Sequence, residues 1–270
     1  MSPLAPTRPQ LDYGIGGAST GPAIVLINGL GGMRQAWYNQ VQVFNETHRV
    51  LSYNHRGIGG SELLDSPATC RDYARDLLGL LNHVGIYRAV LAGVSFGGRI
   101  AQEFAVAWPD RVAGLVLVGT SGGGAGHTPG DPGALTLLER SAVLTADEWL
   151  QGLIPHLFGP AYRQQQGARL ERLARWWATH PQPPAAIARQ WQAMGRFDRW
   201  DELAGIQAPC LVVHGSADTL SPPINGERLA ARIPRARLAM LEGLGHSPHI
   251  EDPQAFEGLL RDFLEEIGHE

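Results

Sequence analysis

The pentapeptide Gly93-Val94-Ser95-Phe96-Gly97 matches the G-x-S-x-G pattern, in which a serine lies on a sharp turn between a strand and a helix. The pattern alone is weak evidence in a chain with 34 glycines, and it recurs around Ser19 and Ser121. Ser19 precedes a predicted strand, and Ser121 runs into glycines that start a helix poorly. Only Ser95 follows an apolar run and precedes a helical pattern, so we predict that Ser95 lies on the nucleophile turn.

Short apolar runs alternate with longer amphipathic patterns on both sides of this turn. Runs typical of strands buried on both faces occur at 24–27, 50–53, 89–92, 115–118, 210–213 and 237–241. Helical patterns occur at 70–83, 97–107, 225–232 and 253–266. This alternation predicts an α/β fold with a doubly wound, mostly parallel sheet. Residues 11–14 are a candidate antiparallel edge strand.

Residues 123–205 interrupt the alternation, because they contain no convincing strand. Helical segments are predicted at 146–157, 167–179 and 184–194. Five of the seven tryptophans lie in this region: Trp149, Trp176, Trp177, Trp191 and Trp200. We therefore predict an all-helical cap at 123–205, inserted between two parts of a core domain at 1–122 and 206–270. The tryptophans either form the core of the cap or, in one or two cases, face a substrate pocket.

The composition excludes several classes of function. The chain has 22 basic residues, all arginine, and 26 acidic residues, which give a net charge of −4. Without lysine there is no Schiff-base chemistry and no P-loop, and we expect neither a cofactor nor a nucleic-acid partner. Any cation that contacts an acidic substrate must be an arginine, such as Arg34 or Arg99, although a surface role is expected for each.

The same composition predicts a cytoplasmic protein. Two cysteines are too few for a disulfide framework and favour a reducing compartment. Residues 1–10 contain three prolines and no apolar run typical of a signal peptide. No stretch is apolar enough for a transmembrane helix, so no membrane partner is expected.

A serine becomes a nucleophile only when a neighbouring base accepts its proton. His246 follows the last predicted strand, so it is expected at the same sheet edge as Ser95. His249 is the competing base; it could also form half of a metal site with His246, but a third ligand is lacking and no metal is predicted. Asp218 follows the strand at 210–213 and is the candidate carboxylate that orients His246. His214 is expected to be structural.

An oxyanion hole needs two donors that face the developing negative charge. The backbone N–H of Phe96, directly after the nucleophile, is one candidate. The loop at 28–32 reads Asn-Gly-Leu-Gly-Gly, and its glycines allow the backbone to approach a ligand closely. We choose the N–H of Leu30 as the second donor.

Taken together, these segments resemble the α/β-hydrolase superfamily, in which the catalytic residues follow the order Ser, Asp, His. The likeness covers nearly all of the chain except the helical insertion. It rests on residues 28–32, 56–61, 93–97, 214–218 with Pro222, and 245–246. Serine at the turn makes the relatives that use an aspartate or a cysteine there poor matches, namely dehalogenases, epoxide hydrolases and dienelactone hydrolases.

Two departures from the family pattern are informative. Asn28 stands where relatives usually have histidine, and Asn54 replaces an acidic residue before the segment 56–61. The chain resembles the enol-lactone hydrolases of the 3-oxoadipate type in carrying asparagine at this position, Asn28. This resemblance implies lactone or enol-ester substrates. We place Asn28 as a substrate-binding candidate; alternatively, its carboxamide only braces the loop.

The resemblance and the residues together predict a serine hydrolase that cleaves a small ester or lactone through an acyl-enzyme. Ser95, Asp218 and His246 would be catalytic, with Leu30 and Phe96 at the oxyanion. The alternative keeps the fold but replaces hydrolysis by a lyase, cyclase or C–C bond-cleaving reaction. A third hypothesis is a binding protein in which the site has become a receptor. The sequence predicts no oligomeric state.

Overall fold

The computed structural model of the chain describes residues 8–18 and 23–268. Ser19, one of the three serines in the G-x-S-x-G pattern, lies outside the described residues, as do residues 1–7 of the segment considered for a signal peptide. No helix of the described residues is both long enough and apolar enough to cross a membrane.

The predicted sheet is confirmed, and it has seven strands among the described residues. They are β1 (Tyr13–Gly17), β2 (Ala23–Ile27), β3 (Arg49–Tyr53), β4 (Ala89–Val94), β5 (Val112–Val118), β6 (Cys210–Gly215) and β7 (Ala236–Leu241). Their spatial order is β1-β3-β2-β4-β5-β6-β7. Strand β1 pairs antiparallel with β3, and all other pairs are parallel. The expected edge strand therefore exists, shifted from 11–14 to Tyr13–Gly17.

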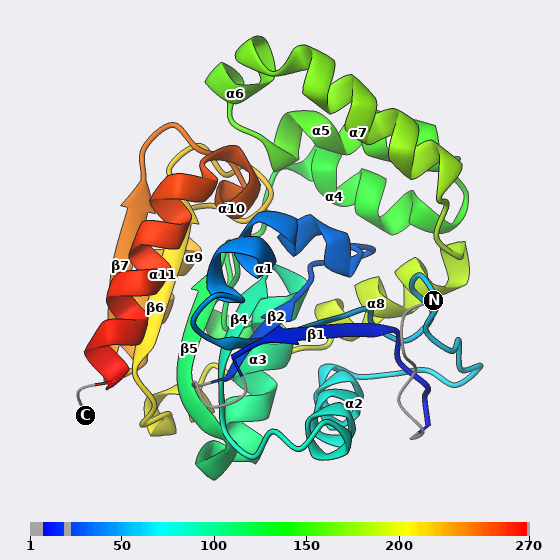
Figure 1. Cartoon of the computed structure of the whole chain (residues 1–270). Coiled ribbons are helices and arrows are strands. Elements are labelled where there is room, and N and C mark those ends of the chain that lie inside the picture. Colours follow the sequence, from blue (N-terminus) through cyan, green and yellow to red (C-terminus); the bar gives the residue numbers. More distant parts are fainter. Residues whose placement is uncertain (1–7, 19–22, 269–270) are drawn as a thin grey trace.

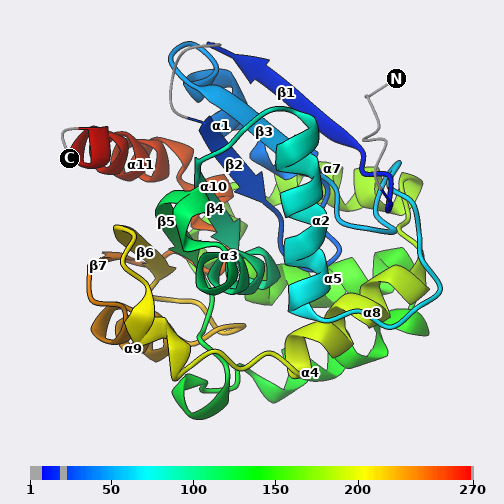
Figure 2. The same ribbon diagram turned by 90° about the horizontal axis from the view of Figure 1, so that it is seen from below.

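Helices cover both faces of the sheet, as Figure 2 shows. One face carries α1 (Tyr38–Phe44) and α11 (Pro253–Gly268), and the other carries α2 (Cys70–His83), α3 (Phe96–Ala107) and α9 (Ile224–Arg232). Alternation along each strand explains the two layers. In β2, Ile24 and Leu26 pack with α1 and α11, whereas Val25 and Ile27 pack with α2, α3 and α9. The continuous apolar runs are thus strands buried on both faces.

Between β5 and β6 the described residues form helices α4 (Pro132–Glu139), α5 (Ala146–Leu157), α6 (Pro160–Gln165), α7 (Gly167–Thr179) and α8 (Pro184–Gly195). We call residues 132–195 the cap segment. Figure 1 shows α4, α5, α6 and α7 stacked above one end of the sheet. The observed helices fall inside the predicted limits 123–205, while the division of the chain into separate domains stays a prediction.

Short elements complete the chain. Helix α10 spans Pro248–Glu251, and 3-10 turns occur at Arg34–Trp37, Pro109–Arg111, Gly124–Gly126, Arg140–Ala142 and Glu202–Gly205. Because the loops after β2, β4, β5, β6 and β7 all lie at the carboxyl edge of the sheet, residues distant in sequence meet under the cap segment.

Candidate active site

Ser95 lies on a sharp turn between β4, which ends at Val94, and α3, which begins at Phe96. Its φ of 55° and ψ of −113° make it the only non-glycine residue with positive φ among those described. Such a conformation costs on the order of 1–3 kcal/mol and persists only where the surroundings enforce it. The neighbouring glycines are required by space, since a Cβ on Gly97 would lie 2.4 Å from the Ile27 carbonyl oxygen.

Ser121, the other described serine in this pattern, has no such turn. It follows β5, but the next α-helix begins only at Pro132. Its Oγ lies 2.9 Å from His127 Nδ1 and accepts a hydrogen bond from Arg99. The local geometry therefore singles out Ser95 among the described candidates.

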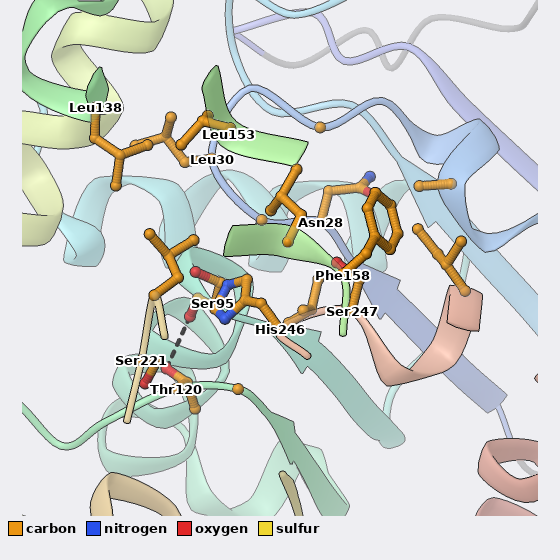
Figure 3. Close-up of a pocket in the computed structure, with 18 of the residues that line it drawn as sticks. Asn28, Leu30, Ser95, Thr120, Leu138, Leu153, Phe158, Ser221, His246 and Ser247 are labelled. Carbon is orange, nitrogen blue, oxygen red and sulfur yellow. Dashed lines mark hydrogen bonds between the residues drawn. The ribbon is translucent and has the colours of Figure 1, made fainter. Parts of the chain in front are cut away.

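His246 lies in the loop after β7 and borders the same cavity as Ser95. Figure 3 shows both side chains on the wall of this cavity. The Nδ1 atom of His246 lies 2.8 Å from Asp218 Oδ2. An ionised carboxylate can only accept, so Nδ1 donates and the Nε2 atom keeps its lone pair. His246 is thereby held in the tautomer that can accept a proton.

Asp218 is buried and fully bonded in the loop after β6. Its Oδ1 accepts hydrogen bonds from the backbone N–H groups of Leu220 and Ser221, at 2.9 and 2.8 Å. Burial alone would raise the pKa of the Asp218 carboxyl, but the charges and hydrogen bonds of His246 and His214 outweigh it and hold that pKa below its usual value. Asp218 therefore stays ionised.

His214 has a closer relation to this site than the sequence indicated. Its Nε2 donates to the Ser221 carbonyl oxygen at 2.7 Å and lies 3.3 Å from Asp218 Oδ2. His214 is fully buried at the end of β6. It is structural, as expected, but its structural role is to fix the loop that carries Asp218.

The loop after β2 approaches Ser95 closely. A Cβ on Gly29 would lie 3.5 Å from Ser95 Cβ, and the Gly32 N–H closes a turn on the Gly29 carbonyl oxygen at 3.1 Å. Among the described residues, neither the Leu30 N–H nor the Phe96 N–H makes a hydrogen bond. Neither of these two N–H groups is therefore occupied by another part of the described chain.

Gln190, on α8 of the cap segment, holds this loop in place. Its Oε1 accepts a hydrogen bond from the Gly31 N–H at 2.8 Å, and the side chain is fully buried. Sequence reasoning missed Gln190, because 159 residues separate it from Gly31 and no local pattern marks the contact.

Asn28 is fully buried and borders the cavity. Its Nδ2 donates to the Tyr53 carbonyl oxygen at 3.1 Å, which braces the loop against β3. Its Oδ1 has no hydrogen-bond partner among the described residues. One end of the carboxamide therefore supports the loop, and the other end is available as an acceptor.

The cavity above Ser95 has a volume of about 610 Å³ and is mostly apolar. Leu30, Leu138, Leu153 and Phe158 project into it from several elements, as Figure 3 shows. Four of the five tryptophans at 123–205 border it: Trp149, Trp176, Trp177 and Trp191. The same four pack on one another and on neighbouring apolar side chains, so they serve both as core and as pocket wall.

His249 also borders the cavity but is held as a structural residue. Its ring packs on Trp37 with centroids 4.3 Å apart, and burial, followed by the nearby His246, lowers the pKa of His249 to about 3. Within the described residues, no group of three or more His, Cys, Asp or Glu side chains is arranged to hold a metal ion.

This fold and arrangement define the class of protein. The sequence model of the Alpha/beta hydrolase family matches residues 24–259, and the chain belongs to this family. It is an enzyme family whose relatives are named for hydrolase activities.

Individual relatives give more detail. The chain is 32% identical over 248 residues to RutD of Pseudomonas savastanoi pv. phaseolicola, whose name proposes carbamate hydrolysis; the match covers 90% of this chain and 93% of that protein. It is 26% identical to 3-oxoadipate enol-lactonase 2 of Acinetobacter baylyi, over 91% and 90% of the two chains. The crystal structure of the enol-lactonase from Burkholderia xenovorans LB400 superposes with a TM-score of 0.88 at 28% identity, covering 97% of this chain and all of that one.

Proposed function

We propose that this protein is a serine hydrolase that cleaves a small ester or lactone through an acyl-enzyme. The observation that carries the proposal is the 2.8 Å contact between His246 and Asp218, on the wall of a cavity that is also lined by Ser95, a serine in a strained turn. A nucleophile, a base and a group that orients the base are the three parts that acyl transfer requires.

In the proposed first step, Ser95 Oγ attacks the carbonyl carbon while His246 Nε2 accepts the hydroxyl proton. The ionised Asp218 stabilises the resulting imidazolium. The tetrahedral intermediate then expels the alkoxide, which takes the proton from His246. With a lactone, this leaving alkoxide stays attached to the acyl group.

In the second step, a water molecule attacks the acyl-enzyme, with His246 again acting as base and then returning a proton to Ser95. The N–H groups of Leu30 and Phe96 would stabilise the oxyanion in both steps. Such donors contribute roughly 3–4 kcal/mol each to transition-state stabilisation when they are fixed before the reaction. Their lack of other partners supports this assignment.

The choice of ester or lactone substrates rests on the cavity and on the relatives. An enol-lactonase shares the fold at 28% identity, and another is 26% identical in sequence. A cavity of about 610 Å³ suits a small substrate. The carbamate activity proposed for RutD would require the same attack on an activated carbonyl, so a carbamate belongs in the substrate panel.

A second candidate is a lyase, cyclase or C–C bond-cleaving reaction on the same fold. The buried Oδ1 of Asn28 favours it, because an unpaired acceptor can bind an enol or hydroxyl group of a substrate. In that reaction Ser95 and His246 would transfer protons without a stable acyl-enzyme.

We also propose that the cap segment acts as a lid over Ser95, within a cap domain at 123–205. A cytoplasmic location is proposed as well. It is supported by Cys70 and Cys210, which are both free and buried, as is common in reducing compartments.

The test is a panel of esters, lactones and carbamates assayed with the wild type and with Ser95→Ala. We expect kcat to fall by a factor of about 10³ or more on the best substrate, since the three catalytic groups act as a unit. Ser66→Ala, at an exposed serine outside the cavity, is the matched control and should keep full activity. Activity of Ser95→Ala within tenfold of the wild type would refute the proposal.

A further inference from the structure

Arg99 does not have the surface role that the sequence favoured. It lies in the first turn of α3, where its backbone N–H donates to the Ser95 carbonyl oxygen at 3.3 Å. Its side chain borders the cavity. By contrast, Arg34 forms an ion pair with Asp12.

Arg99 has no acidic partner among the described residues. Its guanidinium donates to the Met194 carbonyl oxygen and to Ser121 Oγ, at 2.5 and 3.1 Å. Arginine has five N–H donors, so three remain without a partner among the described residues. Burial lowers the pKa of Arg99 to about 10, which leaves the group charged at neutral pH. A deeply placed cation without a carboxylate is costly, and an anionic ligand would remove that cost.

The described groups that surround Arg99 carry no negative charge that would balance the charge of its guanidinium. Burial, followed by the charge of Arg99 itself, lowers the pKa of His127 to about 4, so His127 is neutral at physiological pH. The Phe197 ring centroid lies 5.8 Å from the guanidinium carbon. The polar groups in contact are therefore neutral and the wall is aromatic, which suits a ligand that brings its own negative charge.

We propose that Arg99 binds a carboxylate of the substrate, so that the natural substrate is a small ester or lactone that carries a carboxylate a few bonds from the reacting carbonyl. This inference rests on the proposed function and narrows its substrate class. Planar N–H donors of arginine match the two oxygens of a carboxylate. Because the hydrogen bond from the Arg99 N–H to the Ser95 carbonyl oxygen ties the two residues together at the start of α3, the carboxylate also fixes the carbonyl relative to Ser95 Oγ.

The experiment compares matched pairs of esters that differ by one carboxylate. On the acyl side, mono-4-nitrophenyl glutarate is paired with 4-nitrophenyl pentanoate. On the alcohol side, 3-carboxyphenyl butyrate is paired with phenyl butyrate. The value of kcat/KM is measured for the wild type, Arg99→Gln, Arg99→Lys, Arg71→Gln and Arg169→Gln. Arg71 pairs with Glu103 outside the cavity and serves as the control for a general change in charge.

We expect the wild type to prefer the charged member of at least one pair. Arg99→Gln should lower kcat/KM for that member by about ten- to a hundredfold, the usual effect of losing a charged hydrogen bond. The uncharged member should change by less than about threefold, Arg99→Lys should restore part of the preference, and Arg71→Gln should leave it intact.

Three results would overturn the inference. An equal loss on both members of each pair would make Arg99 a purely structural residue. An unchanged preference in Arg99→Gln would show that it does not contact the carboxylate. Loss of the preference only in Arg169→Gln, at an exposed arginine that also borders the cavity, would place the anion elsewhere.

The binding of glutarate separates failure of this inference from failure of the proposed function. Cavity tryptophan fluorescence is titrated with glutarate at constant ionic strength. If Ser95→Ala hydrolysed the esters as fast as the wild type, the proposed function would be wrong, yet glutarate affinity would still report on Arg99. We expect Arg99→Gln to weaken that affinity at least tenfold, and no binding to the wild type, or equal binding to both, would overturn the anion site.

Discussion

The carboxyl edge of the sheet and the cap segment above it are built in different ways. At the edge, polar groups are fixed by short hydrogen bonds, such as those from His246, Leu220 and Ser221 to Asp218. The cap segment contributes mainly apolar surface, including four tryptophans on the cavity wall. Under the proposed function, the edge would determine the reaction and the cap segment would determine which substrates reach it.

The two regions are nevertheless joined at the points that matter for the proposed chemistry. Gln190 on α8 accepts from the Gly31 N–H next to Leu30. The Glu251 carboxylate accepts from the Gly159 N–H of the cap at 2.7 Å and from the Gly245 N–H, next to His246, at 2.8 Å. A change in the cap segment can therefore move either the candidate oxyanion donor Leu30 or the candidate base His246.

The largest effect is expected from a change at the edge. Asp218→Asn would leave His246 without a negative partner and would allow the wrong tautomer, so kcat should fall by a factor of about 10³–10⁴. KM should change little, because Asp218 does not border the cavity. Asp110→Asn, at an exposed aspartate, is the control measured in the same steady-state assay. A loss below tenfold in Asp218→Asn would mean that His246 does not depend on this carboxylate.

An intermediate effect is expected where the two regions meet. Gln190→Met removes the acceptor for the Gly31 N–H but keeps a similar volume, so the turn that carries Leu30 loses its support. We expect kcat to fall roughly ten- to a hundredfold, less than the loss of an oxyanion donor itself, with KM changed by less than threefold. Gln207→Met, at an exposed glutamine, is the matched control. If Gln190→Met lowered the melting temperature but left kcat unchanged, Gln190 would contribute to the stability of the fold and not to catalysis.

The smallest effect is expected from the cap wall. Trp177→Ala would enlarge the cavity next to Trp149, whose ring centroid lies 6.3 Å away. KM for esters with a long acyl chain should rise by about three- to tenfold, while kcat/KM for an acetate ester should stay within twofold, since acetate does not reach the cap. If both esters lost activity equally, the cap would not act as the specificity wall.

The difference between the two regions explains which features of the fold and of the candidate site could be predicted from the sequence. The strands, their mostly parallel arrangement and the turn at Ser95 were predictable, because hydrophobic periodicity, glycine spacing and the alternation of strands with helices are local signals. The positions of Asp218 and His246 were predictable because loops after parallel strands meet at one edge. Strand β1 begins two residues later and ends three residues later than predicted, since its position is set by pairing with β3 rather than by its own apolar pattern.

Contacts between distant segments were not predictable. Gln190 gives no local signal, and the proximity of His214 to Asp218 depends on how the loop after β6 turns back on its strand. Arg99 was expected at the surface because a charged helix residue usually lies there. Its place beside the cavity follows from α8 and the loop after β5, whose Met194 and Ser121 receive its hydrogen bonds.

The central claim is that Ser95 becomes acylated. The most direct test mixes the wild type with 4-nitrophenyl acetate, stops the reaction with acid during the first turnover, and locates the added mass by peptide mass spectrometry. We predict one acetyl group on the peptide that contains Ser95, released as product in later turnovers, and none at any residue in Ser95→Ala. An acetyl group at another residue, or turnover without any acylated intermediate in the folded wild type, would contradict the account.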